Sequence, residues 1–286
     1  MIHFLKYKFI CFAGSIAMII AGVSGYIYYD GFRYSVDFTG GTQGRFSMSQ
    51  KVGSEKLKEI ITAGGWNDPV IREFENNDVI IRIAAFANDS QGLVQKMSEV
   101  MRAQLPDVKI EILEANIVGS GVGESLRTNA LLMGFFVLLA MLLYIAFRFW
   151  SWSYGVGVIA ALIHDALFLL TVLAIFQKEI SPHVVVAILA TLGYSMNDTI
   201  VILSQVRKNF AKMKGHSAEY IIDLSLNQTL RRTLLTSFAT ALMVGCAYIF
   251  GGETLHGLTF TLLVGIAIGT YSSVYVASPV MLLLKQ

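Results

Sequence analysis

Carboxylates inside apolar segments are the residues of this sequence whose types and positions could do chemistry. Asp165 follows His164 near the middle of one apolar stretch, and Asp198 follows Asn197 in the inner half of the next. A charged Asp, Lys or Arg at the centre of a membrane helix costs about 2.5–3.5 kcal/mol on insertion scales. Carboxylates retained at that cost are typical of ion or proton pathways, so these two pairs are candidate relay residues.

Asp198 belongs to a polar stripe on one face of its predicted helix. The stripe consists of Thr191, Ser195, Asp198 and Gln205. Arg232 begins the next apolar stretch, and its long side chain can extend along a helix, so pairing with Asp198 is geometrically allowed. A cation that approaches and leaves a buried carboxylate changes its proton affinity. The alternative to such a relay is a fixed hydrogen-bonded or ion-paired contact between helices.

The His164–Asp165 pair leaves the same two alternatives open. Histidine titrates near physiological pH, as a relay requires, but a buried histidine also serves as a packing donor. The sequence has no phosphate-binding G-x-x-x-x-G-K-[ST] loop, no Cys/His spacing for zinc and no nucleophile–base pair. We therefore expect no enzyme activity, no metal and no cofactor, and the net charge of +2 does not indicate nucleic-acid binding.

The composition is that of a polytopic membrane protein. Of 286 residues, 55% are hydrophobic and only 15% charged, and the mean hydropathy is positive. A membrane helix needs about 20 apolar residues to cross roughly 30 Å of hydrocarbon. Six stretches qualify, at residues 9–29, 128–147, 153–176, 183–206, 233–250 and 257–284.

Charges in the short connections predict the topology. Basic residues favour the cytoplasmic side of a membrane, and they precede the first span, follow the second and crowd the connection between the fourth and fifth. Both termini are then cytoplasmic, and 30–127 is extracytoplasmic. The predicted parts are the first span (1–29), an external domain (30–127) and a five-span bundle (128–286). Around 207–232 we expect a basic cytoplasmic loop and an amphipathic surface helix, capped by Ser217 over 215–227.

The external segment shows a strand and helix pattern. Strands are predicted at 44–49, 70–75, 79–84 and 108–118, with helices at 54–63 and 90–105. The order β-α-β-β-α-β is that of a ferredoxin-like α+β domain. No catalytic constellation accompanies it, so we interpret it as a binding or docking module.

Small residues recur at every fourth position on several spans. Gly265, Gly269 and Ser273 form such a series on the sixth span, and similar series occur on the first and fifth. This spacing lets membrane helices approach closely. We interpret the series as packing surfaces; a sliding face between moving helices is the alternative.

Several motifs, in this order, resemble the SecF family of bacterial protein-export subunits. They are Asp37-Phe38-Thr39-Gly40-Gly41 after the first span, 118–123 before the second, 193–201 in the fourth, 230–237 at the start of the fifth and 269–277 in the sixth. The resemblance covers nearly the whole chain. It implies that the family's essential aspartate is Asp198, its essential arginine is Arg232, and its His-Asp pair is His164 and Asp165.

The resemblance also implies partners and an energy source. SecF proteins pair with SecD, resemble resistance-nodulation-division transporters, and assist the SecYEG channel by pulling the preprotein outward with the proton gradient, or sodium in some bacteria. YajC and YidC are further candidate partners. The resemblance also implies that the protein lies in the bacterial inner membrane, in contact with lipid. The sequence departs from the family where Ser204 and Gln205 replace an Asp-Arg pair. There are two alternative functions. In the first, the chain is half of a small-molecule or lipid exporter; in the second, it is a translocon scaffold without an ion pathway.

Overall fold

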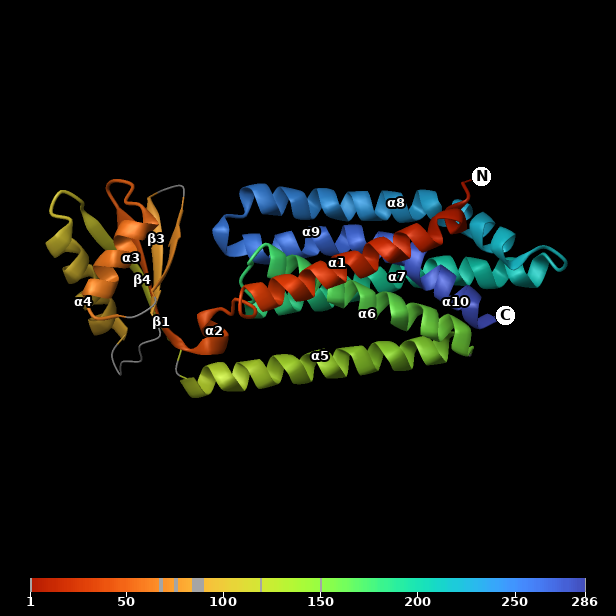
Figure 1. Cartoon of the computed structure of the whole chain (residues 1–286), viewed down its shortest axis with the longest axis horizontal. Coiled ribbons are helices and arrows are strands. Elements are labelled where there is room, and N and C mark those ends of the chain that lie inside the picture. Colours follow the sequence, from red (N-terminus) through yellow and green to blue (C-terminus); the bar gives the residue numbers. More distant parts are fainter. Residues whose placement is uncertain are drawn as a thin grey trace. The chain divides into compact units, whose positions relative to one another are not determined.

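The computed structural model describes residues 2–66, 69–74, 77–83, 90–118, 120–149 and 151–285. The chain forms two compact units (Figure 1). One contains Met1–Arg33 with Leu132–Gln286, and the other contains Tyr34–Leu131. Each is described by itself.

The first unit is a bundle of long helices. Its elements are η1 (Phe4–Tyr7), α1 (Lys8–Tyr28), α5 (Ser120–Phe149, which starts in the other unit), α6 (Trp152–Ile175), α7 (Pro182–Lys212), α8 (Ala218–Phe250), α9 (Glu253–Ser272), the π-helical η2 (Ser273–Ala277) and α10 (Ser278–Lys285). Among the described residues, six helical spans are long and apolar enough to cross a membrane. The six predicted spans are therefore confirmed, and the chain is a multi-pass membrane protein.

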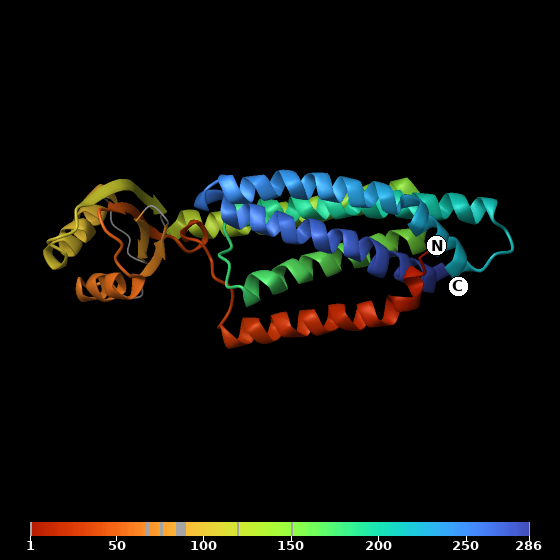
Figure 2. The ribbon, with the colours of Figure 1, turned by 90° about the horizontal axis from the view of Figure 1, so that it is seen from above.

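The inner spans of the bundle are α6, α7 and the α9–α10 span. In Figure 2, α6 lies between α1 and α9, in agreement with the packing of α1 on α6 and of α6 on α9. Helix α8 packs on α7 and α9. Apolar side chains such as Val158, Leu192 and Leu203 fill the space between the inner spans. This packing places the helix faces with the candidate aspartates inside the bundle.

Two helix starts follow local capping rules. Ser181 accepts a hydrogen bond from the backbone N–H of Val184 (3.3 Å), with Pro182 as the first residue of α7. Ser217 accepts one from the N–H of Tyr220 (3.3 Å) at the start of α8. The predicted cap at Ser217 is thus confirmed, and Ser181 and Pro182 start α7 in a similar way.

The segment after that second cap differs from the prediction. No separate surface helix ends near residue 227, because α8 continues without a break to Phe250. Ile221, Ile222 and Leu226 are buried in the bundle core instead of lying on a membrane surface. Since α7 extends to Lys212, the connection between the two helices is also much shorter than the predicted basic loop.

The second unit contains a four-stranded sheet with helices packed on it. Its elements are α2 (Val36–Thr39), β1 (Gly41–Met48), α3 (Ser54–Ala63), β2 (Val70–Glu73), β3 (Asp78–Ile83), α4 (Ser90–Gln104) and β4 (Ile110–Val118). The strand order is β2-β3-β1-β4, with every neighbouring pair antiparallel. Phe46, Ile81 and Met97 are fully buried in its core. The predicted strand ends at Glu75 and Ala84 lie outside the described residues.

Candidate functional site

Asp165 lies at the centre of a hydrogen-bonded cluster inside the bundle. Its side chain is fully buried on α6. Ser195 of α7 and Ser272 of α9 both donate to Oδ2, the latter at 2.9 Å, and Nδ1 of His164 lies 3.1 Å from Oδ1. One carboxylate thus joins three helices. Hydroxyl donors satisfy the oxygens of a buried carboxylate, which would otherwise cost several kcal/mol.

His164 extends this cluster to the first span. Its Nε2 lies 3.0 Å from Oγ of Ser15, and Ser15 Oγ lies 3.2 Å from the hydroxyl of Tyr271. The Tyr271 hydroxyl donates to the backbone carbonyl of Cys11 (2.7 Å). A continuous chain of polar groups therefore runs from Asp165 to α1. The sequence did not single out Ser15, and it placed Tyr271 and Ser272 within the 269–277 motif without indicating their partners, because a hydroxyl in a span carries no signal of its partner.

Asp198 has a sparser environment. It is 3% exposed on α7, and Ser237 of α8 donates to its Oδ2 at a long 3.4 Å. The Ser237 hydroxyl also contacts Thr270 Oγ1 (2.8 Å) and receives a bond from the Tyr194 hydroxyl (3.4 Å). The donor to this carboxylate is therefore a hydroxyl, which can rotate and has other partners within reach.

Arg232 is exposed on α8 and is not paired with Asp198. Between these two described residues, no nitrogen–oxygen distance falls within the 4.0 Å of an ion pair. Arg232 lies one and a half turns before Ser237, about 7 Å along the helix axis. Its charge still acts attractively on Asp198. Arg232 and Ser237 thus lie on the same helix, and Ser237 is the one of the two that contacts Asp198.

The small residues of the sixth span lie against α7. A Cβ added at Gly265 would collide with the side chain of Thr191, and one added at Gly269 would collide with that of Ser195. Farther along, Ser273 Oγ lies 2.7 Å from Thr199 Oγ1. The close approach of these helices brings the hydroxyls of α7 and α9 within reach of Asp165.

The remaining stripe and relay residues separate. Asn197 is exposed on α7 and points away from the buried face that holds Asp198. Gln205 donates to Oε1 of Gln228 on α8 (2.8 Å), nearer the end of the helix. Ser204 accepts a bond from Arg148 of α5 at 3.5 Å. The two polar residues that replace the family's charged pair thus still bind the helices on either side.

A π-helical turn interrupts the last span, which the sequence predicted as one continuous helix over 257–284. It covers Ser273–Ala277, and the Ser278 hydroxyl donates to the Ser273 carbonyl (3.1 Å). Such turns are frequent at functional sites. Ser272 and Ser273, at its start, bind α6 and α7 respectively.

The Asp37–Gly41 motif forms a tight turn in the second unit. Ser35 donates to Oδ2 of Asp37 (3.1 Å), and Thr39 donates to the Ser35 carbonyl (3.2 Å). Phe38 is nearly buried, and Gly40 and Gly41 have φ of +73° and +133°, which favour glycine. The described backbone of α5 passes so close that a Cβ at Gly123 would lie 3.0 Å from Gly40 N. The motif thus shapes the turn beside the start of α5.

Comparisons with known proteins agree on one family. The family model described as "Protein export membrane protein SecD/SecF, C-terminal" matches residues 97–286. The protein translocase subunit SecF of Rhodothermus marinus is 35% identical over 261 residues, which cover 89% of this chain and 84% of the relative. SecF of Haemophilus influenzae is 38% identical over 250 residues, covering 86% and 75%.

A solved structure shares the fold. The crystal structure of SecDF from Thermus thermophilus, a translocon-associated membrane protein, matches with a TM-score of 0.88 and 29% identity. The match covers 99% of this chain but 38% of that one, so the chain corresponds to a part of the SecDF protein. Together with the family model and the relatives, this match shows that the chain belongs to the SecF family of membrane-embedded protein translocase subunits.

Proposed function

We propose that this chain is an auxiliary subunit of the Sec translocase. With a SecD partner, it uses the proton or sodium gradient to promote late export of preproteins through SecYEG. The observation that carries the proposal is the environment of Asp198. This carboxylate is 3% exposed in a membrane span, has one long hydrogen bond from Ser237 and has no ion-pair partner within 4.0 Å among the described residues.

A purely structural carboxylate would have a tighter set of partners. Buried charges in proteins are paired or fully hydrogen-bonded, since leaving one unpaired costs several kcal/mol. Asp165 meets this condition through Ser195, Ser272 and His164. Asp198 does not, and this difference favours a group that alternates between a charged and a neutral form.

The geometry indicates how a cation bound at Asp198 would change the contact between α7 and α8. When Asp198 is ionised, it attracts Arg232 and accepts the hydroxyl of Ser237. When it takes up a proton, the attraction to Arg232 is lost, and Ser237 can donate to Thr270 instead, 2.8 Å away. The change of charge thus alters the contact between α7 and α8. A gradient supplies about 2.3 kcal/mol per charge per 100 mV, enough to shift a helix contact of this kind.

The His164–Asp165 pair, the second candidate of the relay, forms a fixed contact in this proposal. His164 and Asp165 lie 3.1 Å apart and share hydroxyl partners on α1, α7 and α9. Ser195 and Ser272 both donate to the Asp165 carboxylate, so this group is tied to the packing of α6 against α7 and α9. We therefore assign the moving contact to Asp198 and the fixed one to Asp165.

The proposed topology places both termini in the cytoplasm and the second unit outside the inner membrane. Both chain ends lie at one end of the bundle (Figure 1), where Ile2 binds Asn227 and Lys285 binds Tyr154. Arg148 in the last turn of α5 and Lys212 in the last turn of α7 are at this same end, in agreement with the positive-inside rule. The strand order β2-β3-β1-β4 supports a ferredoxin-like docking domain.

The test is export driven by an imposed gradient in inverted membrane vesicles that contain the chain, a SecD chain and SecYEG. We expect Asp198→Asn to abolish gradient stimulation while assembly with SecD is unchanged. Asp30→Asn is the matched control, because Asp30 is exposed and has φ of +56°, a conformation that Asn also adopts.

If the gradient stimulates export normally in Asp198→Asn, the energy-coupling proposal is overturned and the chain acts only as a scaffold. Imposing a sodium gradient at constant pH, and then a pH gradient without sodium, identifies the driving ion.

A further inference from the structure

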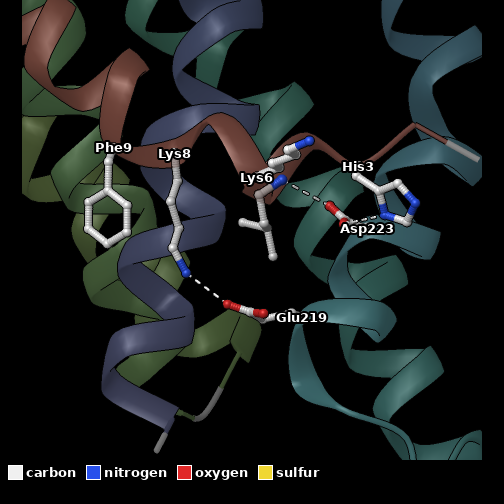
Figure 3. A pocket seen from close by; sticks show the side chains of 7 residues that line it. His3, Lys6, Lys8, Phe9, Glu219 and Asp223 are labelled. Atoms are coloured by element: carbon white, nitrogen blue, oxygen red, sulfur yellow. Dashed lines mark hydrogen bonds and ion pairs between the residues drawn. The ribbon is translucent and has the colours of Figure 1, made fainter.

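The N-terminal segment is bound along one face of α8. Glu219, Asp223 and Asn227 recur at every fourth residue, so they form a row over the first three turns of that helix. Figure 3 shows Glu219 and Asp223 facing the N-terminal residues across a shallow pocket lined by both segments. Each member of the row holds a different part of residues 2–8.

The contacts are specific. The side-chain amide of Asn227 accepts from the N–H of Ile2 (2.9 Å) and donates to its carbonyl (2.8 Å). Oδ1 of Asp223 accepts from the N–H of Leu5 (3.1 Å), while Oδ2 lies 3.5 Å from Nδ1 of His3. The Lys8 ammonium lies 2.8 Å from Oε1 of Glu219 (Figure 3). The row therefore binds both the backbone and the charged side chains of the segment.

Burial makes the attachment more than a surface contact. Phe4 and Leu5 are buried in the main core of the bundle. The ring of Phe4 packs edge-on against Tyr275, in the π-helical turn, with ring centres 6.3 Å apart. A chain end usually frays because few contacts hold it. Here the end has polar partners on α8 and an apolar anchor beside η2.

The attachment links two helices with different roles. Helix α8 carries Arg232 only five residues beyond Asn227, and α1 continues along the chain into the second unit. We propose that residues 2–8 and the row Glu219–Asp223–Asn227 form an N-terminal clamp that makes the first turns of α1 and α8 move as one body. Asp223 and Asn227 are then positioning residues that act through Arg232; this inference rests on the proposed function.

The clamp supplies a mechanical connection. A change at Asp198 alters the contact between α7 and α8, and α8 transmits its displacement to α1 through the clamp. Helix α1 is separately packed on α6, where a Cβ at Gly22 would collide with Thr171. Without the clamp, α8 would move alone and the displacement would not reach α1. The ionisation of one carboxylate would then be decoupled from the span that leads to the external domain.

The first experiment measures whether the two helices move together. Spin labels at Ile10→Cys and Leu235→Cys, both exposed positions, report the distance between α1 and α8 in a Cys11→Ala, Cys246→Ala background. We expect one narrow distance distribution in the complete complex, and a broad one when Asp223→Ala and Asn227→Ala are added. Lys6→Ala is the control on the same segment, since its side chain is exposed. An unchanged distribution in the double variant overturns the clamp.

The second experiment measures coupling in one sample. In a His3→Cys, Asp223→Cys variant of the same Cys11→Ala, Cys246→Ala background, the clamp loses its middle contact, and a short bifunctional thiol reagent restores a link there. We expect gradient-stimulated export to fall about fivefold in the cut form, from roughly 1 kcal/mol of lost hydrogen bonding, and to recover on cross-linking. Gradient-independent export and assembly should not change, which separates positioning from a general loss of structure.

The outcomes are distinguishable from those of the proposed function. If cross-linking abolishes stimulation, the segment must undock during the cycle and the clamp proposal is wrong, even where Asp198→Asn confirms energy coupling. If Asp198→Asn has no effect, the proposed function fails, and the spin-label distances still decide whether α1 and α8 are clamped together.

Discussion

Two spans of nearly equal apolarity, α5 and α6, differ sharply in burial. The most apolar segment of α5 has a mean hydropathy of 2.6 and that of α6 has one of 2.4. Nevertheless, only 6% of the α5 segment is buried within the chain, compared with 56% of the α6 segment. Apolar side chains insert a helix into lipid but do not attract it to other helices there, because lipid is equally apolar. Hydropathy therefore identifies the spans without identifying which of them form the core.

Hydroxyls and small residues make the difference. On the inner spans, Ser195, Thr199 and Ser272 bind side chains of neighbouring helices. On the outer spans, Ser24 and Thr240 donate to carbonyls one turn earlier in their own helices. Hydroxyls that face the core thus join helices, as those of Ser15 and Ser237 also do from the outer spans, whereas Ser24 and Thr240 remain local. Two pairs of substitutions test this comparison, and a third pair tests the clamp.

The largest expected effect on stability is that of adding a methyl group to a glycine of the core. A Cβ at Gly269 would lie 2.8 Å from Cβ of Ser195, whereas nothing lies within 4 Å of one at Gly245 on α8. We expect Gly269→Ala to destabilise the bundle by about 1–3 kcal/mol, since α7 and α9 must separate. Gly245→Ala should be neutral or stabilise by up to about 1 kcal/mol.

Thermal unfolding of the two variants in the same detergent measures the difference. Equal unfolding temperatures would contradict the comparison, because they would show that the α7–α9 contact is no tighter than the outer face of α8. The Gly269→Ala variant should also lose gradient stimulation in parallel with stability, since the displaced Ser195 no longer reaches Asp165.

A smaller effect is expected from removing one hydroxyl. Ser272→Ala leaves the fully buried Asp165 with one donor fewer on Oδ2. Ser195 still donates to this oxygen, so we expect the loss of a single hydrogen bond, about 0.5–1.5 kcal/mol, and a lower unfolding temperature. Thr240→Ala removes a hydroxyl that donates only to the Thr236 carbonyl, and we expect less than about 0.5 kcal/mol. Comparable losses in both variants would mean that the carboxylate is satisfied by other groups.

Much of the fold was predictable from local patterns, because its causes are local. Long apolar runs predicted the spans, period-two and helical patterns predicted the order of strands and helices, and Ser217 predicted where α8 begins. Contacts between distant segments have no such local cause. Asp198 and its neighbour Asn197 were both candidate relay residues, but neighbouring residues on a helix point about 100° apart, and only Asp198 faces the core.

The same limit explains what the sequence missed at the site. Ser15 and Tyr271 reach His164 because α1 and α9 pack beside α6, and nothing near either residue in the sequence indicates this. The π-helical turn depends on the Ser278 hydroxyl and on packing around η2. The continuous α8 was mistaken for two helices because basic residues in its middle resembled a loop, although neither Gly nor Pro occurs in residues 218–244.

The smallest expected effect comes from comparing a charged contact with an uncharged one within the clamp. Lys8 and Glu219 form an ion pair whose side chains are 24% and 61% exposed. Exposed pairs contribute about 0.2–1 kcal/mol and are screened by salt. We therefore expect Glu219→Gln to lower the unfolding temperature slightly at low ionic strength and to have no effect in high salt. The exchanged pair, Lys8→Glu with Glu219→Lys, should restore the low-salt value.

Asn227→Ala provides the contrast, because it removes two hydrogen bonds to the backbone of Ile2 that carry no net charge. Its loss of stability should persist at every salt concentration. If instead Glu219→Gln proves the more damaging change, and salt reproduces its effect in the unmodified protein, then the segment is held by its charges. Backbone recognition by α8 would then be secondary, and the clamp would loosen whenever ionic strength rises, which a fixed mechanical link between α1 and α8 does not allow.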